Sequence, residues 1–260
     1  MVRGLELFRD HFRAFSDQYV LIGGTACDLA LTEAGLAFRA TKDLDIVLCV
    51  EALDADFARA FWAFVKAGGY ELHETAAGEK KFYRFRKPQR PEYPEVLELF
   101  SRVPDALQAA EESQLTPIPF DEEVSSLSAI LLDDAYYAWI HAGKRELNGV
   151  PIVPPEYLIP LKATAWLDLR DRKASGQEVD SKSIKKHKND VFRLFAVIDP
   201  EFRATIAPKI ATDMRRFLEE VLDEPVDLKV FGLPGQTLDS VLAALRTMYG
   251  LGPVLPDPPA

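Results

Sequence analysis

The sequence is poor in the residues that build disulfide frameworks, zinc sites and membrane spans. Its two cysteines, Cys27 and Cys49, lack CxxC spacing, and its four histidines are scattered, so we expect no structural zinc site. No uninterrupted apolar run approaches the roughly 18 residues of a membrane-spanning helix, and the first residues lack the apolar core of a signal peptide. These absences predict a cytoplasmic protein with reduced core thiols and no membrane partner.

Basic residues are in the minority as well. Thirty-one lysines and arginines against forty-one acids give a net charge of −10, which excludes a generally basic nucleic-acid coat protein. Hydrophobic residues make up 48% of the chain, as in ordinary globular proteins, and 260 residues suffice for one large domain or two small ones. The bases gather in two stretches, residues 80–90 and 182–193.

The first 150 residues alternate between strand and helix patterns. Apolar periodicity and glycine stops predict three helices, over 4–16, 25–34 (with Thr25 as N-cap) and 54–67. Short apolar or alternating runs predict five strands, over 19–22, 44–50, 70–74, 81–87 and 95–101. Residues 126–132 are apolar but ambiguous, and Asn148-Gly149 predicts a turn. This order favours an α/β (α+β) fold with a mixed sheet and flanking helices.

After Pro154-Pro155 the patterns become helical only. Helices are predicted over 156–172, 182–198, 200–222 and 237–249, with glycine and proline at their ends. The last residues are rich in proline and predict a loose tail. The sequence therefore predicts an α/β domain over 1–150, a helical domain over 151–252 and a tail over 253–260.

The strongest functional pattern joins a glycine turn to a pair of aspartates. Gly23-Gly24-Thr25 follows an apolar strand, and Asp43 and Asp45 open the next strand, where alternate residues point to one side. Two carboxylates this close repel each other unless a cation lies between them, and magnesium binds carboxylates together with substrate phosphates. The glycines let backbone approach a phosphate, which the N–H groups of the following helix can also bind. Together these residues predict a site for a metal-bound nucleoside triphosphate (NTP).

The residues of these motifs resemble those of a known superfamily. Gly23-Gly24-Thr25-Ala26 and Thr41-Lys42-Asp43-Leu44-Asp45-Ile46 resemble the signature of nucleotidyltransferase-fold proteins, and most closely the AbiEii-type toxins of abortive-infection and toxin–antitoxin systems, including the MenT branch. The resemblance implies a nucleotidyltransferase-type sheet and a helical domain that completes the nucleotide cleft. It also implies transfer of a nucleoside monophosphate from an NTP, with two Mg²⁺ ions bridging the carboxylates and the triphosphate.

The superfamily expects a third carboxylate on a neighbouring strand. Glu98 is the first candidate, because strand alternation places it opposite in facing to Leu97 and Leu99, and a strand carboxylate flanked by leucines needs a metal or a base role. Glu95 is the alternative, with the opposite facing and Pro94 beside it. Many relatives carry aspartate at this position, so the glutamate is a departure. A surface glutamate on an edge strand is the ordinary alternative.

The helical half carries a second pattern. Lys186-His-Lys-Asn-Asp-Val-Phe-Arg-Leu194 resembles the AbiEii-type helix in which basic residues precede an aspartate and two hydrophobic residues, and Lys162 fits the lysine of the preceding helix. The resemblance implies that Lys162 and Lys186 or Lys188 reach triphosphate oxygens, with Asp190 orienting them. The ordinary alternative is a solvated basic face.

Two further basic features have weaker support. Lys80-Lys-Phe-Tyr-Arg-Phe-Arg-Lys87 interleaves aromatics with cations, which suits a base or a tRNA end, although a half-buried strand with a charged face explains it more simply. Arg39, shortly before the aspartates, is a further candidate for phosphate contact.

Three functions are compatible with these patterns. The first is a magnesium-dependent nucleotidyltransferase toxin that modifies tRNA or a protein hydroxyl, with a cognate antitoxin as a possible partner. The second is a small-molecule enzyme of the aminoglycoside-modifying type on the same fold. The third is a degenerate relative that binds nucleotide or RNA without turnover, and the retention of Asp43, Asp45 and Glu98 argues against it.

Overall fold

The chain folds into two compact units, Met1–Leu158 and Ile159–Ala260. The structure, a computed structural model, describes residues 2–49, 52–71, 82–100 and 133–252. The first unit holds a mixed sheet with flanking helices, and the described residues of the second form helices and connecting loops. The predicted mixed sheet with flanking helices is confirmed at this level. The predicted domain boundary near residue 150 falls at the start of a strand, Val150–Ile152, that belongs to the sheet of the first unit.

The sheet has six strands in the order β3-β4-β2-β1-β6-β5. Their bounds are β1 Tyr19–Ile22, β2 Asp43–Leu48, β3 Phe82–Arg86, β4 Val96–Phe100, β5 Arg145–Leu147 and β6 Val150–Ile152. β2 runs parallel to β4 and antiparallel to β1, and the edge strand β3 runs antiparallel to β4. The predicted strands over 19–22, 44–50, 81–87 and 95–101 are confirmed within one or two residues at each described end. The β5–β6 hairpin was not predicted, since three-residue strands are too short to show alternation.

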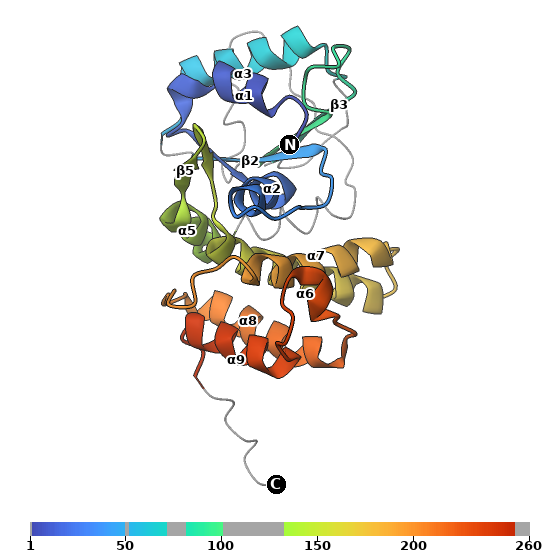
Figure 1. Ribbon diagram of the computed structural model, residues 1–260. Helices are drawn as coiled ribbons and strands as arrows, with labels where there is room; N and C mark the ends of the chain where they lie inside the picture. The colour runs from blue at the N-terminus through green and yellow to red at the C-terminus, as the bar shows by residue number, and fades with distance from the viewer. Residues whose placement is uncertain (1, 50–51, 72–81, 101–132, 253–260) are drawn as a thin grey trace. The chain divides into compact units, whose positions relative to one another are not determined.

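One face of the sheet packs against an aromatic layer. The helices of this layer are α1 (Leu5–His11) and α3 (Ala55–Gly68), and they lie on the opposite side of the sheet from α2 (Gly23–Glu33) in Figure 1. Tyr19 of β1 is fully buried there, with ring centroids 5.5 Å from Phe8 and 6.4 Å from Phe57. Strand residues alternate between the two faces of the sheet. The residues next to those on the aromatic face of β1, β2 and β4 therefore point towards α2.

Two of the predicted helices of this unit end or begin differently. The helix expected over 4–16 is α1 followed by a separate 3-10 turn, Arg13–Phe15. The helix expected from Thr25 begins at Gly23, with no side-chain cap, so the N-cap assignment of Thr25 was wrong. The helix over 54–67 is confirmed as α3, and the aromatic stretch before the hairpin forms α5 (Asp134–Gly143).

Several predictions fall partly or wholly outside the described residues. Of the strand expected over 70–74, Tyr70 lies outside any strand and Glu71 forms an isolated bridge to Arg86, while residues 72–74 lie beyond the described part. The ambiguous segment 126–132, the tail 253–260 and the basic residues at 80 and 81 also lie outside it.

The second unit is built from α6 to α9 and short 3-10 turns. Its elements are α6 Pro155–Ala174 (which begins in the first unit), α7 Ser181–Phe195, α8 Pro208–Glu220, η2 Val221–Asp223, η3 Leu228–Phe231 and α9 Leu238–Met248. The helix predicted over 200–222 starts too early. Residues 202–207 are not helical, because the Ala204 N–H donates to Met248 O at 2.8 Å and Pro208, with its fixed φ, starts α8. No helix among the described residues is long and apolar enough to cross a membrane.

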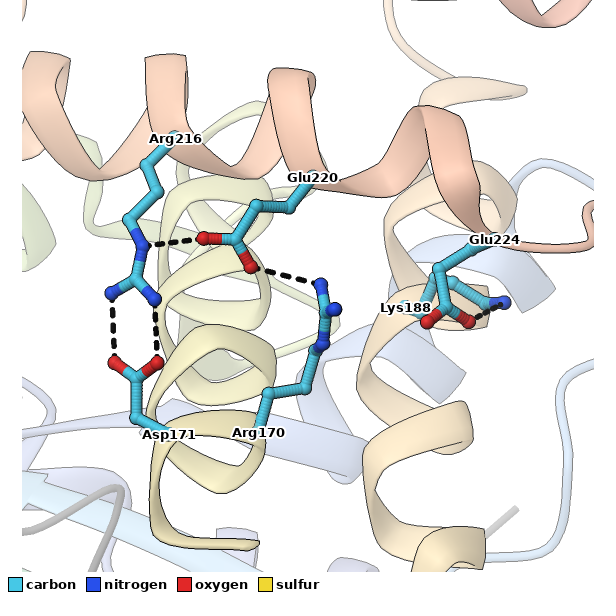
Figure 2. Close-up of polar contacts among 6 residues, drawn as sticks. All are labelled: Arg170, Asp171, Lys188, Arg216, Glu220 and Glu224. Carbon is cyan, nitrogen blue, oxygen red and sulfur yellow. Dashed lines mark hydrogen bonds and ion pairs between the residues drawn. The ribbon is translucent and has the colours of Figure 1, made fainter. Parts of the chain in front are cut away.

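Ion pairs join the helices of the second unit (Figure 2). Arg216 of α8 contacts the carboxylates of Asp171 and Glu220, and Arg170 of α6 donates to Glu220 at 2.8 Å. The Arg216 hydrogen bonds lower the pKa of the Asp171 carboxyl. These side chains are about one third to one half exposed, so solvent screens them and each pair contributes about 1 kcal/mol or less.

Candidate metal and nucleotide site

The glycine pair lies where β1 passes directly into α2. Gly23 has φ +65°, a left-handed conformation that costs a side-chain-bearing residue energy. A Cβ on Gly23 would lie 1.7 Å from Asp45 Oδ2, so Asp45 fills the space that only glycine leaves open. The Gly24 N–H donates to the same Oδ2 at 3.3 Å, which places a carboxylate at the positive end of α2. The glycines therefore bring backbone against Asp45 in this structure.

Thr25 connects α2 to the aspartate strand. It is fully buried, and its Oγ1 donates to the backbone oxygen of Asp43 at 2.7 Å. Since α2 begins at Gly23, Thr25 lies within the first turn of the helix and is not its N-cap. This bond fixes the start of β2 relative to α2 without using the carboxylate of Asp43.

Two carboxylates meet across adjacent strands. Asp45 and Glu98 are direct partners in the parallel pairing of β2 with β4, with 8% and 5% of their surfaces exposed. Burial raises the pKa of Glu98 well above its ordinary value, the charge of Asp45 and a hydrogen bond with it raise it further, and Arg84 partly opposes the rise. Burial and the neighbouring carboxylate of Asp45 therefore favour the protonated form of Glu98 when no metal is bound.

Asp43 and Glu95 occupy different surroundings. Asp43 is half-buried and precedes Asp45 by two residues on β2, so both point to the α2 side of the sheet. Glu95 lies outside β4, and its exposed carboxylate pairs with Lys42 at 3.0 Å. Of the two candidates for the third carboxylate, the structure thus brings Glu98 to Asp45 and commits Glu95 to a surface lysine.

The donor set suits magnesium. Within the described ranges, no group of three His, Cys, Asp or Glu side chains is already arranged to hold a metal ion. Magnesium ordinarily takes one or two carboxylates and completes its shell with water and substrate phosphates. The buried Asp45–Glu98 pair, with Asp43 two residues away, provides the oxygen donors for that mode. The raised pKa of Glu98 reflects in part the repulsion from Asp45 that a bound cation would relieve.

Arg39 and Thr41 lie beside the glycine turn. A Cβ on Gly24 would come within 2.5 Å of Thr41 Oγ1 and 3.7 Å of the Arg39 guanidinium. The guanidinium also stacks 4.8 Å from the Phe38 ring centroid. The segment before β2 thus carries a cation to the first turn of α2, as the phosphate-contact prediction for Arg39 requires.

The predicted nucleotide-binding lysines of the second unit fall into two groups. Lys162 is buried on α6, with its Nζ 3.6 Å from Oδ2 of the fully buried Asp190, and Arg193 contacts the other oxygen of Asp190 at 3.1 Å. Asp190 therefore partners Lys162, which fits its expected orienting role. Lys186 is half-buried on α7.

Lys188 is used inside the helical unit. Its Nζ donates to Glu224 Oε2 at 2.9 Å and to Pro225 O at 3.0 Å, with only 2% of the residue exposed. Figure 2 shows this pair where η2 ends beside α7. Because the ammonium is tied within its own unit, the expectation that Lys188 reaches triphosphate oxygens in place of Lys186 finds no support here.

Arg84 is the site residue that sequence reasoning missed. Its Nε forms an ion pair with Glu98 Oε1 at 2.8 Å, and the two residues are cross-strand partners in the β3–β4 pairing. The basic-aromatic alternation of residues 80–87 contained the signal, since Phe85 packs on the aromatic side and Arg84 must then face the carboxylates. What was absent was the strand order, which places β3 next to β4.

We expect Gly23→Ala to disturb the site more than its backbone conformation alone explains. Gly35→Ala is a matched control, because Gly35 has φ +73° and open space around it. The control isolates the cost of a left-handed alanine, about 1–2 kcal/mol. Gly23→Ala adds the clash with Asp45, so its loss of unfolding free energy in denaturant titrations should exceed that of the control by 1 kcal/mol or more, about the cost of strain at such sites. Equal losses in the two variants would contradict the close approach.

Comparison with known proteins assigns no family to this geometry. No family model matches the chain, and no curated protein is significantly similar to it. The resemblance of the motifs around Gly23 and Asp43 to AbiEii-type toxins stays a prediction.

Proposed function

We propose that the chain is a metal-dependent nucleotidyltransferase that transfers a nucleoside monophosphate from an NTP to an acceptor hydroxyl and releases pyrophosphate. One observation carries the proposal: a single buried carboxylate, Asp45, contacts both the glycine turn at the start of α2 and Glu98 on the neighbouring strand. A structural role explains either contact alone, but a protein has little reason to bury two carboxylates beside a glycine turn unless a cation and a phosphate belong there.

Each residue has a role that follows from its position. Asp43, Asp45 and Glu98 would hold Mg²⁺, which when bound neutralises charge on the attacking and leaving oxygens. Gly23 and Gly24 allow the triphosphate to approach backbone N–H groups, and Thr25 keeps α2 against β2. The acceptor oxygen forms a bond to the α-phosphorus, the bond from phosphorus to pyrophosphate breaks, and the acceptor proton passes to Glu98.

The helical unit has a buried charged cluster of its own. A buried lysine needs a partner for its charge, and Lys162 is held by the fully buried Asp190. We assign Lys162 and Lys186 to triphosphate oxygens, with Asp190 orienting Lys162 and Arg193 completing its charge balance.

The proposed acceptor is tRNA or a protein hydroxyl, and the proposed setting is a toxin of a toxin–antitoxin or phage-defence system with a cognate antitoxin. The exposed lysines at the start of α7, Lys182 and Lys185, supply positive charge on an acidic chain, which favours a phosphate-rich acceptor over a cationic small molecule.

A labelling experiment tests the proposal. The purified chain is incubated with each of four α-³²P-labelled NTPs, Mg²⁺ and, in separate reactions, total tRNA, cell lysate or aminoglycosides. We expect Mg²⁺-dependent label on RNA or protein from at least one NTP. Label on aminoglycosides alone would show that the acceptor is a small molecule and not RNA or protein. If NTP binds but no reaction gives label, the chain is a nucleotide-binding protein and not an enzyme.

A further inference from the structure

A row of three charged residues crosses the sheet beside the proposed metal site. Asp45 on β2 pairs with Glu98 on β4, and Glu98 pairs with Arg84 on β3. Directly paired residues place their side chains on the same face, so the carboxylate pair continues into an arginine at the edge of the sheet. The row therefore ends in a cation that belongs to the chain itself.

The arginine is committed to Glu98 and shielded from water. Arg84 Nε lies 2.8 Å from Glu98 Oε1, and the two side chains are 11% and 7% exposed. An exposed pair would be screened and worth little, whereas a charge buried at this level persists only with a partner. Phe85, the next residue, packs against Phe61 and Trp62 on the other face, which fixes the direction of Arg84.

We propose that Arg84 is a built-in counter-cation of the carboxylate row, which positions Glu98 and takes up charge that a second divalent cation would otherwise neutralise. The inference rests on the proposed function only in taking Asp43, Asp45 and Glu98 as cation ligands. With Arg84 in place the protein alone binds divalent cations weakly, and a full complement arrives only together with the triphosphate.

The inference predicts that removing Arg84 strengthens the binding of divalent cations. Removing a residue from a binding site normally weakens binding, but removing a positive charge a few ångströms from carboxylates strengthens their attraction for a cation. Arg84→Met and Arg84→Gln remove the charge, and the glutamine retains a hydrogen-bonding group beside Glu98. Arg84→Lys keeps the charge. Arg59→Met is the matched control, since it removes an arginine that is ion-paired with Asp56 on the exposed surface of α3, on the opposite side of the sheet from α2.

The test titrates each full-length variant with Mn²⁺ alone and measures free Mn²⁺ by electron paramagnetic resonance. Circular dichroism melts show which variants fold. We expect the neutral variants to bind Mn²⁺ at least about tenfold more tightly than the wild type. Arg84→Lys and Arg59→Met should stay within about threefold of the wild-type affinity. A tenfold change is a small part of the Coulomb energy between a cation and the Arg84 charge a few ångströms away. If Arg84→Met does not fold, Arg84→Gln decides.

The outcomes separate this inference from the proposed function. Unchanged or weaker Mn²⁺ binding in a folded neutral variant overturns the counter-cation, and so does the absence of Mn²⁺ binding in both wild type and neutral variants. Tighter Mn²⁺ binding in a chain that transfers no nucleotide supports the counter-cation and removes the proposed function. If the chain transfers nucleotide but the neutral variants do not bind Mn²⁺ more tightly, the proposed function is supported and the counter-cation is rejected.

Discussion

Replacing Asp43 with asparagine is expected to lower nucleotide transfer by about 10³-fold or more while leaving the fold intact. The substitution removes one negative charge from the proposed metal ligands, and metal-assisted charge stabilisation is worth several kcal/mol, each 1.36 kcal/mol being a factor of ten in rate. The fold is expected to survive because Asp43 is half-buried, asparagine keeps the size of the side chain, and the hydrogen bond from Thr25 uses the backbone oxygen.

The measurement is the initial rate of label transfer at saturating NTP and Mg²⁺, with unfolding free energy as the check on folding. Asp56→Asn is the control, because it removes an exposed carboxylate of α3 that is ion-paired only at the surface. The control is expected to keep full activity. If Asp43→Asn retains a tenth or more of the wild-type rate, Asp43 is not a ligand of the catalytic metal.

Replacing Glu98 with glutamine is expected to separate stability from activity. Burial and the neighbouring Asp45 raise the pKa of Glu98, so the folded metal-free protein keeps a proton that the unfolded chain has already lost. The wild type therefore loses stability as pH rises above the ordinary glutamate value, by about 1.4 kcal/mol per unit of difference between the folded and unfolded pKa. Glutamine resembles the protonated acid and has no proton to lose.

Chemical denaturation in EDTA at pH 5 and pH 8 measures this effect. The unfolding free energy of Glu98→Gln relative to wild type should rise by about 1 kcal/mol or more between the two pH values. Transfer activity should fall by about 10²-fold or more, since the acceptor loses its base. Glu95→Gln is the control, and it should change neither property, because Glu95 pairs with Lys42 at the surface. A relative stability independent of pH would show that Glu98 is ionised in the metal-free protein.

Local patterns predicted most of the fold, and their failures have physical causes. β1 and α3 follow from an apolar run and from helical periodicity closed by glycines, and both are confirmed. The start of α8 failed because Pro208, inside the predicted stretch, starts the helix rather than continuing it. The β5–β6 hairpin was not predicted because its three-residue strands are too short to show alternation.

The site divides in the same way. Spacing along β1 and β2 was enough to nominate Gly23 and Asp45, and the resemblance to the superfamily, together with strand alternation, nominated Glu98. It could not distinguish Glu98 from Glu95 with certainty, nor reveal that Arg84 faces the carboxylates, because both depend on which strands are neighbours. Nor could the sequence show that Lys188 pairs with Glu224, because that partner lies on another element of the helical unit.

The most direct measurement of the central claim is the mass of the acceptor after reaction, recorded together with the pyrophosphate released. The account predicts that the acceptor gains one nucleoside monophosphate for each pyrophosphate released, that EDTA abolishes both, and that Asp43→Asn produces neither. An acceptor of unchanged mass with NTP intact, or a product formed at the same rate by Asp43→Asn, would contradict the assignment of Asp43, Asp45 and Glu98 as the centre of a nucleotidyltransferase.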